Sequence, residues 1–231
     1  MPGKGEEKSV INPDILSYDL DGTLVDSIPD ITLSMNMTLK EKSLPPISQE
    51  QMKTFVGNGI PAMVERALKV SLAEIHAPNT FETLYQEILD RYKQIYQEHC
   101  TDETRLYTGA KEIVTHFSYK IQVLITNKAE SMTRKILNYF GLENAFSVIV
   151  GGDTLPEKKP NPAVIAYIYK KTALQRTLCH IGDSPIDIET ALASNCTAIA
   201  VSWGYSSRQA LINAHPHYII DHFNELKEII A

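Results

Sequence analysis

Two carboxylates stand two residues apart near the start of the chain, in the stretch DILSYDLDGTLVDS. The short apolar run before them predicts a buried strand, so Asp19 and Asp21 would stand where the chain leaves a sheet. Residues two apart point to the same side of a strand, and Gly22 would allow a sharp turn directly after them. One carboxylate could attack as a nucleophile while the other carries a proton. Taken alone, the same residues fit a solvated glycine turn equally well.

These two roles require different protonation states. A nearby cation would keep Asp19 ionised, whereas repulsion between the two acids would favour a proton on Asp21. The pattern therefore predicts that a positive charge from elsewhere in the chain, or a bound metal ion, meets this strand end.

Three later stretches carry chemistry that would complete such a site. Thr126 and Asn127 directly follow the apolar run IQVLI, and a hydroxyl with free backbone N–H groups suits a phosphoryl oxygen. Lys159 lies in EKKPNP, where prolines would hold a lysine as a fixed point charge. Asp183 and Asp187 follow LCHI, and such acids suit Mg²⁺.

Each of these stretches also has an ordinary explanation. They could be a threonine N-cap, an exposed lysine pair and an N-capping acid with a second acid in the first helical turn. Their convergence on strand ends indicates instead one shared site for phosphate and magnesium.

The elements that must position these residues can be read from periodicity. Short apolar runs predict strands, alternating with helical patterns, at 121–125, 146–150, 178–181, 197–201 and 217–220. This alternation predicts an α/β fold, a Rossmann-like three-layer core with a mostly parallel sheet. Open α/β sheets bind ligands at the carboxyl ends of their strands, where the candidate residues fall.

Residues 28–101 follow a different pattern, in which helical periodicity dominates and no strand is evident. A capping box is expected at 48–51, and the tyrosine-rich stripe over 81–96 predicts packed core rather than a cofactor site. We therefore expect two domains, an α/β core made of 1–27 and 102–231 and an inserted α-helical domain.

Composition excludes several classes of function. The net charge of −6 and the absence of basic runs argue against nucleic acid as a partner, and no apolar run is long enough for a membrane span. The first 14 residues carry no apolar signal region and predict a flexible tail. Three cysteines without metal-like spacing predict free thiols in a reducing compartment, hence a cytoplasmic protein.

The stretches DLDGTLVDS, ITNK, KKPNP and GDSPID, in this order, resemble the motifs of the haloacid dehalogenase superfamily of phosphohydrolases. The resemblance spans nearly the whole chain after the tail, and the helical insertion is similar to that superfamily's small cap. FVGNGIPAMVERAL, VIVGGDTLPEKKPNP and VSWGY are most similar to the phosphoglycolate phosphatase family. Two residues depart from the usual pattern: Tyr18 stands where Phe is common, and Ser17 is polar in a strand expected to be buried.

The resemblance implies a role for each core residue. Asp19 would be the nucleophile that forms an aspartyl-phosphate, and Asp21 would protonate the leaving alkoxide and then activate water. Thr126 and the backbone N–H of Asn127 would hold the phosphoryl group. Lys159, rather than its neighbour in the lysine pair, would neutralise charge on nucleophile and phosphate.

The resemblance also implies a magnesium site and a substrate-reading cap. Mg²⁺ would be held by the Asp19 carboxylate, the Asp21 carbonyl and Asp183, with Asp187 as a further ligand or in the outer shell. A loop from the cap, made of Gly57, Asn58 and Gly59, could drop over the site. A substrate carboxylate would need a donor from the cap, and the nearby charges are Lys53, Arg66 and Lys69. The sequence does not choose between them, and Arg66 is the one that we count among the candidate site residues.

The function that follows is a Mg²⁺-dependent phosphatase acting on a small phosphate ester, as a monomer or homodimer. The expected reaction converts 2-phosphoglycolate to glycolate and phosphate. Pyrophosphate or a sugar phosphate is the alternative substrate, and a phosphosugar mutase is a further alternative. A non-enzymatic regulator on the same fold is disfavoured, because a binding module needs neither a nucleophile nor a proton shuttle.

Overall fold

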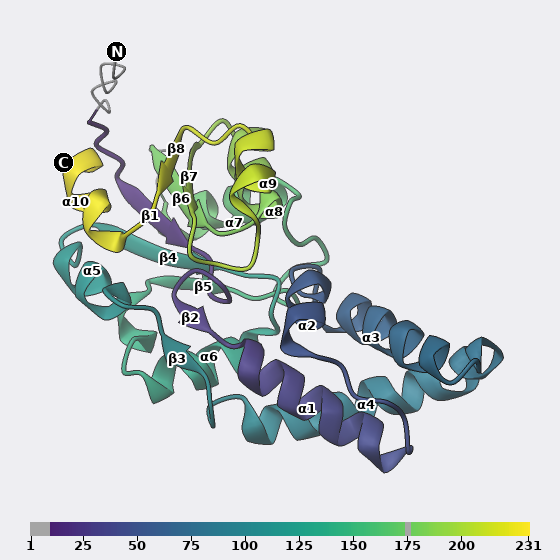
Figure 1. The fold of residues 1–231 in the computed structure, drawn as a ribbon. Helices are drawn as coiled ribbons and strands as arrows, with labels where there is room; N and C mark the ends of the chain where they lie inside the picture. The colour runs from purple at the N-terminus through teal and green to yellow at the C-terminus, as the bar shows by residue number, and fades with distance from the viewer. Residues whose placement is uncertain (1–9, 174–176) are drawn as a thin grey trace.

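The computed structural model describes residues 10–173 and 177–231, so most of the predicted N-terminal tail lies outside the described residues. Its centre is a six-stranded sheet in the order β5-β4-β1-β6-β7-β8, in which every pairing is parallel (Figure 1). The strands are β1 (Ile15–Tyr18), β4 (Ile121–Ile125), β5 (Val148–Val150), β6 (Leu178–Gly182), β7 (Thr197–Val201) and β8 (Tyr218–Ile220). The predicted α/β fold with a mostly parallel sheet is confirmed.

Helices cover both faces of this sheet. Successive strand residues face opposite sides, so Leu16 belongs to one apolar cluster and Ile15 to the other. The cluster around Leu16 includes side chains of α5 (Ala110–His116), α6 (Glu130–Tyr139) and α10 (Leu226–Ile229). The cluster around Ile15 includes side chains of α7 (Ala163–Thr172), α8 (Pro185–Ala193) and α9 (Arg208–Asn213). The core is therefore a three-layer sandwich.

Strand bounds agree with the sequence pattern at β4 and β7 and differ slightly elsewhere. The run expected over 146–150 forms a strand only from Val148. Ser147 bonds to the carbonyl of Gln122 through both its N–H, at 2.9 Å, and its hydroxyl, at 3.0 Å. Phe146 instead packs edge-on against Tyr18, with ring centroids 6.1 Å apart.

Residues 28–101 are helical, as predicted, and contain α1 (Ile28–Glu41), α2 (Gln49–Phe55), α3 (Ile60–Glu74) and α4 (Phe81–His99). Figure 1 places these helices together at the lower right, beside the sheet. The predicted capping box is present, since Ser48 and Gln51 bond reciprocally at the start of α2. The division of the chain into two domains at 27/28 and 101/102 stays a prediction.

The chain enters and leaves this helical segment through two very short strands that the sequence did not predict. β2 (Val25–Asp26) pairs antiparallel with β3 (Arg105–Leu106). Two residues are too few to show a periodic pattern, and their partners lie far apart in the sequence. The pairing of β2 with β3 therefore holds the two connections to the helical segment side by side.

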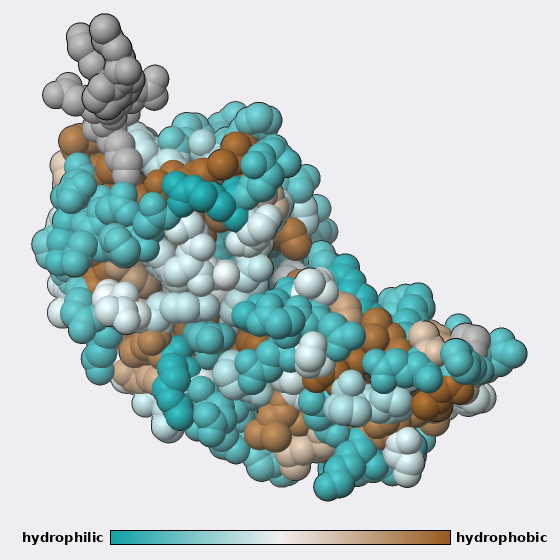
Figure 2. Space-filling view, in the orientation of Figure 1, coloured by the Kyte–Doolittle hydropathy of each residue, from teal (hydrophilic) through white to brown (hydrophobic). Residues whose placement is uncertain are grey.

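The surface and the cysteines of the structure are close to what the sequence predicts. Figure 2 shows a mostly hydrophilic or neutral face, with hydrophobic residues surfacing in places over the helical segment at the lower right. Leu33 and Ile75 are exposed apolar side chains of that segment, at 41% and 47%. Within 10–173 and 177–231, no helix combines the length and apolarity that crossing a membrane requires. The three cysteines are free and buried.

Candidate active site

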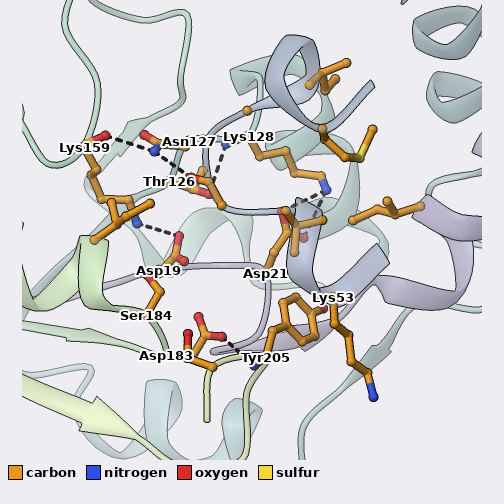
Figure 3. A pocket seen from close by; sticks show the side chains of 18 of the residues that line it. Asp19, Asp21, Lys53, Thr126, Asn127, Lys128, Lys159, Asp183, Ser184 and Tyr205 are labelled. Carbon is orange, nitrogen blue, oxygen red and sulfur yellow. Dashed lines mark hydrogen bonds and ion pairs between the residues drawn. The ribbon is translucent and has the colours of Figure 1, made fainter. Parts of the chain in front are cut away.

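The candidate residues meet at the carboxyl ends of three neighbouring strands. Asp19 follows β1, Thr126 follows β4 and Asp183 follows β6, and β1 lies between the other two. Together with Asp21 and Lys159 they line a cavity of about 100 Å³ (Figure 3). The sequence prediction that these stretches converge agrees with this arrangement.

Lys159 is the buried cation at the centre of the site. Its Nζ lies 2.9 Å from Oδ1 of Asp19 and 2.6 Å from Oδ1 of Asp187. Burial alone would lower the pKa of Lys159, but the two carboxylates outweigh it and raise that pKa above its usual range. The neighbouring Lys158 is exposed and donates to the carbonyl of Asn58 at 2.7 Å. Only Lys159 of the lysine pair therefore contacts the acids.

Asp187 has protein partners on both carboxylate oxygens. Oδ1 accepts from Lys159 and lies 3.3 Å from Nε2 of His180, while Oδ2 accepts from the N–H and hydroxyl of Ser184. Burial would raise the pKa of Asp187, but Lys159 and His180 hold it well below its usual range. Because its oxygens are already engaged, this arrangement favours an outer-shell role over direct ligation of a metal.

The negative charges of Asp19 and Asp183 are less well balanced by donors and cations than the charge of Asp187. The approach of Lys159 to Asp19 is an ion pair without hydrogen-bond alignment, so the buried Oδ1 has no hydrogen-bond donor among the described residues. Burial raises the pKa of Asp19 to about 6 despite Lys159. Burial raises the pKa of Asp183 well above its usual range, and the negative charges of Asp187 and Asp19 raise it further. The bond that Oδ2 accepts from the N–H of Tyr205, at 2.7 Å, does not offset this.

This imbalance of charge fits a divalent cation. Asp19, Asp183 and Asp187 each offer a carboxylate oxygen, and the three oxygens lie within 4.8 Å of one another. Oxygen ligands from a few carboxylates are what Mg²⁺ prefers in proteins. The donor set and the raised pKa values of Asp19 and Asp183 therefore suit Mg²⁺.

Asp21 belongs to a separate cluster on the other side of the cavity. Both of its oxygens lie 3.0 Å from Nζ of Lys128, and Oδ1 also accepts from the Ser27 hydroxyl at 2.5 Å. Lys128 is itself buried and lies 2.5 Å from the Tyr96 hydroxyl. Asp19 and Asp21, two residues apart in the sequence, thus meet different cations, which separates their chemistry.

Sequence reasoning missed Lys128 and Tyr96 as site residues. Lys128 could have been noticed, because it stands in ITNK directly after two candidate residues. Tyr96 and Tyr92 lie on the stripe that predicted packed core, and they are indeed buried, but both also line the cavity. That part of the prediction was incomplete.

The Thr126 and Asn127 side chains serve different purposes. The Thr126 hydroxyl accepts from the N–H of Lys128 at 3.3 Å and lines the cavity. The Asn127 amide donates to the carbonyl of Gly57 at 2.9 Å and to that of Lys159 at 3.1 Å. Asn127 therefore ties the Gly57 loop and the Lys159 loop to the end of β4.

The loop of Gly57, Asn58 and Gly59 lies against the core residues. Gly57 and Gly59 have φ of +107° and +88°, a backbone region that suits glycine, and both line the cavity. Arg66 donates to the carbonyl of Phe55 and to Oδ1 of Asn58, both at 2.8 Å, so its guanidinium supports the loop from behind.

Of the three charges considered for the substrate carboxylate, only Lys53 is among the residues that line the cavity. Its Nζ pairs with Glu50 at 2.8 Å, and its ammonium points away from the other labelled groups in Figure 3. Lys69 pairs with Glu65. The structure thus brings together the predicted core residues, whereas Arg66 and Lys69 stand outside the cavity lining.

Comparisons with known proteins identify the family of the chain. The sequence profile of the haloacid dehalogenase-like hydrolases matches residues 16–201. A phosphoglycolate phosphatase of Haemophilus influenzae is 34% identical over 219 residues, covering 94% of this chain and 97% of the relative. One of Chromobacterium violaceum is 38% identical over 201 residues, covering 85% and 88%.

A solved structure extends the likeness to three dimensions. The crystal structure of a protein described as a predicted phosphoglycolate phosphatase from Haemophilus somnus has a TM-score of 0.88 at 32% identity, covering 94% of this chain and 97% of that one. The profile match includes every core residue of the candidate site. The chain described here is a member of the haloacid dehalogenase-like hydrolase family.

Proposed function

We propose that this chain is a Mg²⁺-dependent phosphatase that hydrolyses 2-phosphoglycolate to glycolate and phosphate through an aspartyl-phosphate. The observation that carries the proposal is the pairing of the buried carboxylate of Asp19 with the buried ammonium of Lys159, at a strand end that lines a cavity. The names of the relatives support the reaction and the substrate.

In the first step, a carboxylate oxygen of Asp19 attacks phosphorus while the bond between phosphorus and the ester oxygen breaks. Asp21 gives a proton to the departing alkoxide. Lys159 and the Thr126 hydroxyl would stabilise the charge that spreads over the phosphoryl oxygens. Mg²⁺ held by Asp19 and Asp183, by the Asp21 carbonyl and through the outer shell by Asp187 would supply further positive charge at this point.

In the second step, water attacks the phosphorus of the aspartyl-phosphate. Asp21, now deprotonated, takes the proton from that water, and the bond between phosphorus and the Asp19 oxygen breaks. Phosphate leaves and Asp19 is restored. The same side chain thus serves as acid and then as base.

The proposal extends to the helical segment as a cap domain over residues 28–101. Three contacts support it, joining Asn127 to Gly57, Lys158 to Asn58 and Lys128 to Tyr96. A cap that excludes stray water would protect the aspartyl-phosphate.

The relatives and the thiols bear on substrate and setting. The names of the relatives favour a two-carbon ester over a sugar phosphate. Pyrophosphate is the second candidate substrate, because it is equally small. The free, buried thiols of the chain support a reducing, cytoplasmic setting.

A substrate comparison tests the proposal. Phosphate release from 2-phosphoglycolate, pyrophosphate and glucose 6-phosphate is measured side by side with Mg²⁺ and with chelator, using the wild-type chain and Asp19→Asn. We expect the highest kcat/KM on 2-phosphoglycolate, and activity that requires both Mg²⁺ and Asp19. An isomerised sugar phosphate without free phosphate would identify a mutase instead.

The covalent step needs its own measurement. Acid quench of a reaction with ³²P-labelled substrate should trap label on wild-type protein, and Asp19→Asn should carry none. Hydrolysis that persists in Asp19→Asn would overturn the mechanism.

A further inference from the structure

We propose that Lys128 binds the carboxylate of the substrate, so that a core residue rather than a cap residue distinguishes 2-phosphoglycolate from alkyl phosphates that lack a carboxylate. The inference rests on the proposed function and deepens it. It assigns a specificity role to a residue whose side chain no step of the reaction above uses.

The position of Lys128 is the first argument. Its side chain is 4% exposed, and its Nζ lies 3.0 Å from both oxygens of Asp21. The same Nζ lies 2.5 Å from the Tyr96 hydroxyl and 4.6 Å from the centre of that ring. Figure 3 shows the side chain reaching across the top of the pocket toward Asp21.

The connectivity of the substrate is the second argument. In 2-phosphoglycolate, one methylene group carries both the ester oxygen and the carboxylate. Asp21 must come within hydrogen-bond reach of that ester oxygen to protonate it. The carboxylate is therefore confined to the immediate surroundings of Asp21, where the ammonium of Lys128 already lies.

Charge is the third argument. A carboxylate that enters this buried pocket loses its hydration, so a cation must lie beside it. Among the described residues that line the cavity, the lysines are Lys53, Lys128 and Lys159. Lys159 is engaged by the acids at the nucleophile, and Lys53 is paired with Glu50 on the exposed side. Lys128 is also paired, with Asp21, but it is the lysine that lies at the leaving-group end.

The surroundings of Lys128 hold it ready for this role. An ammonium has three N–H donors, and here they face the Asp21 carboxylate and the Tyr96 hydroxyl. The Tyr96 ring stacks on Tyr92 with centroids 5.5 Å apart, which fixes the hydroxyl. A substrate carboxylate would replace a neutral hydroxyl as the partner of Lys128, which gives a stronger, charge-assisted bond.

The test compares two substrates of the same length, 2-phosphoglycolate and 2-hydroxyethyl phosphate, in which a hydroxymethyl group replaces the carboxylate. Their ratio of kcat/KM is measured for the wild-type chain, Lys128→Met, Tyr96→Phe and Lys53→Met. We expect Lys128→Met to reduce the preference for 2-phosphoglycolate by about ten- to a hundredfold, the loss of one bond between charged groups. Tyr96→Phe keeps the ring and the lysine and should leave most of the preference intact.

Each outcome decides the inference. An equal loss on both substrates in Lys128→Met would mean that Lys128 acts only through Asp21, and a lost preference in Lys53→Met would assign the role to Lys53. Either result overturns it. Should Lys128→Met fail to fold, the same ratio is measured for Lys128→Gln. A wild-type chain that hydrolyses neither ester would refute the proposed phosphatase function itself, whereas equal hydrolysis of both would refute only the carboxylate site.

Discussion

The hydroxyl of Ser17 lies 2.9 Å from Nδ1 of His180, across the β1–β6 pairing and behind the acids of the site. The other ring nitrogen, Nε2, lies 3.3 Å from Oδ1 of Asp187. Because a carboxylate only accepts, Nε2 carries the hydrogen and Nδ1 accepts from Ser17. Burial keeps the pKa of His180 below its usual range, in keeping with this neutral tautomer. The polar residue in the first strand thus fixes a histidine that supports Asp187.

Ser17→Ala should therefore lower the free energy of unfolding by about 1–3 kcal/mol, because it leaves the buried Nδ1 of His180 without a donor. Urea unfolding followed by circular dichroism measures the change. Ser34→Ala is the matched control, since the buried Ser34 hydroxyl has no hydrogen-bond partner among the described residues and its removal should cost little. Equal stability of Ser17→Ala and the wild-type chain would contradict the role of this pair.

The Ser17–His180 pair also shows where sequence reasoning stops. A polar residue in an apolar strand is visible in the sequence, but its partner lies 163 positions away and only the strand order brings them together. The core of the site was predictable, because Asp19, Thr126 and Asp183 each directly follow a strongly apolar strand. Parallel pairing then places such residues at one edge.

Contacts that depend on tertiary packing were not predictable in the same way. Lys128 stands beside two candidate residues, yet nothing local says that its ammonium turns toward Asp21 and Tyr96. The β2–β3 pair is too short for any periodic signal. The periodic pattern of apolar residues in α4 correctly predicts which face of the helix is buried. It does not indicate which part of that face packs against other side chains and which part borders a cavity.

Magnesium should stabilise the folded chain through the Asp19–Asp183 site. A ligand present at a hundred times its dissociation constant adds about 2.7 kcal/mol to the free energy of unfolding, so the melting temperature should rise with added Mg²⁺. Asp183→Asn should abolish most of this rise, whereas Asp90→Asn, which changes an exposed acid of α4, should keep it. Differential scanning calorimetry with and without chelator measures both. A rise that is equal in all three chains would place the bound metal elsewhere.

Without metal, the same Asp183→Asn substitution should stabilise the chain at neutral pH. Burial and the nearby carboxylates of Asp187 and Asp19 raise the pKa of Asp183, which means that its charged form is unfavourable in the folded state. An asparagine removes that charge and can still accept from the N–H of Tyr205. The prediction is checked by urea unfolding in chelator, and a lower stability of the variant would refute it.

Gly204, in the loop after β7, should be required for the position of Asp183. A Cβ atom added there would lie 2.2 Å from the Cβ of Asp183 and 2.5 Å from the carbonyl oxygen of Gly22. Gly204→Ala should therefore displace Asp183 and weaken the melting-temperature response to Mg²⁺ by at least half. Gly141→Ala is the control: its φ of +68° makes alanine strained there, but among the described residues the methyl group meets only Lys111, at 3.8 Å. It should lose stability and keep the Mg²⁺ response.

Asn127 should control how the loop of Gly57 lies over the site. Its amide holds both the Gly57 carbonyl and the Lys159 carbonyl. Asn127→Ala removes both bonds, so the loop should open more often and Lys159 should lose its fixed position. Because small displacements of reacting groups cost up to about a hundredfold in rate, we expect kcat/KM to fall by about ten- to a hundredfold.

Limited proteolysis gives a second measurement of the same effect, because an open loop exposes the peptide bond after Phe55 to chymotrypsin. Lys158→Met is the matched control, since it removes a bond from the same lysine loop to Asn58 that is exposed to solvent. It should accelerate cleavage less than Asn127→Ala does, because an exposed bond competes with water. If Asn127→Ala is cleaved at the wild-type rate while its activity falls, Asn127 acts through Lys159 alone and not through the loop.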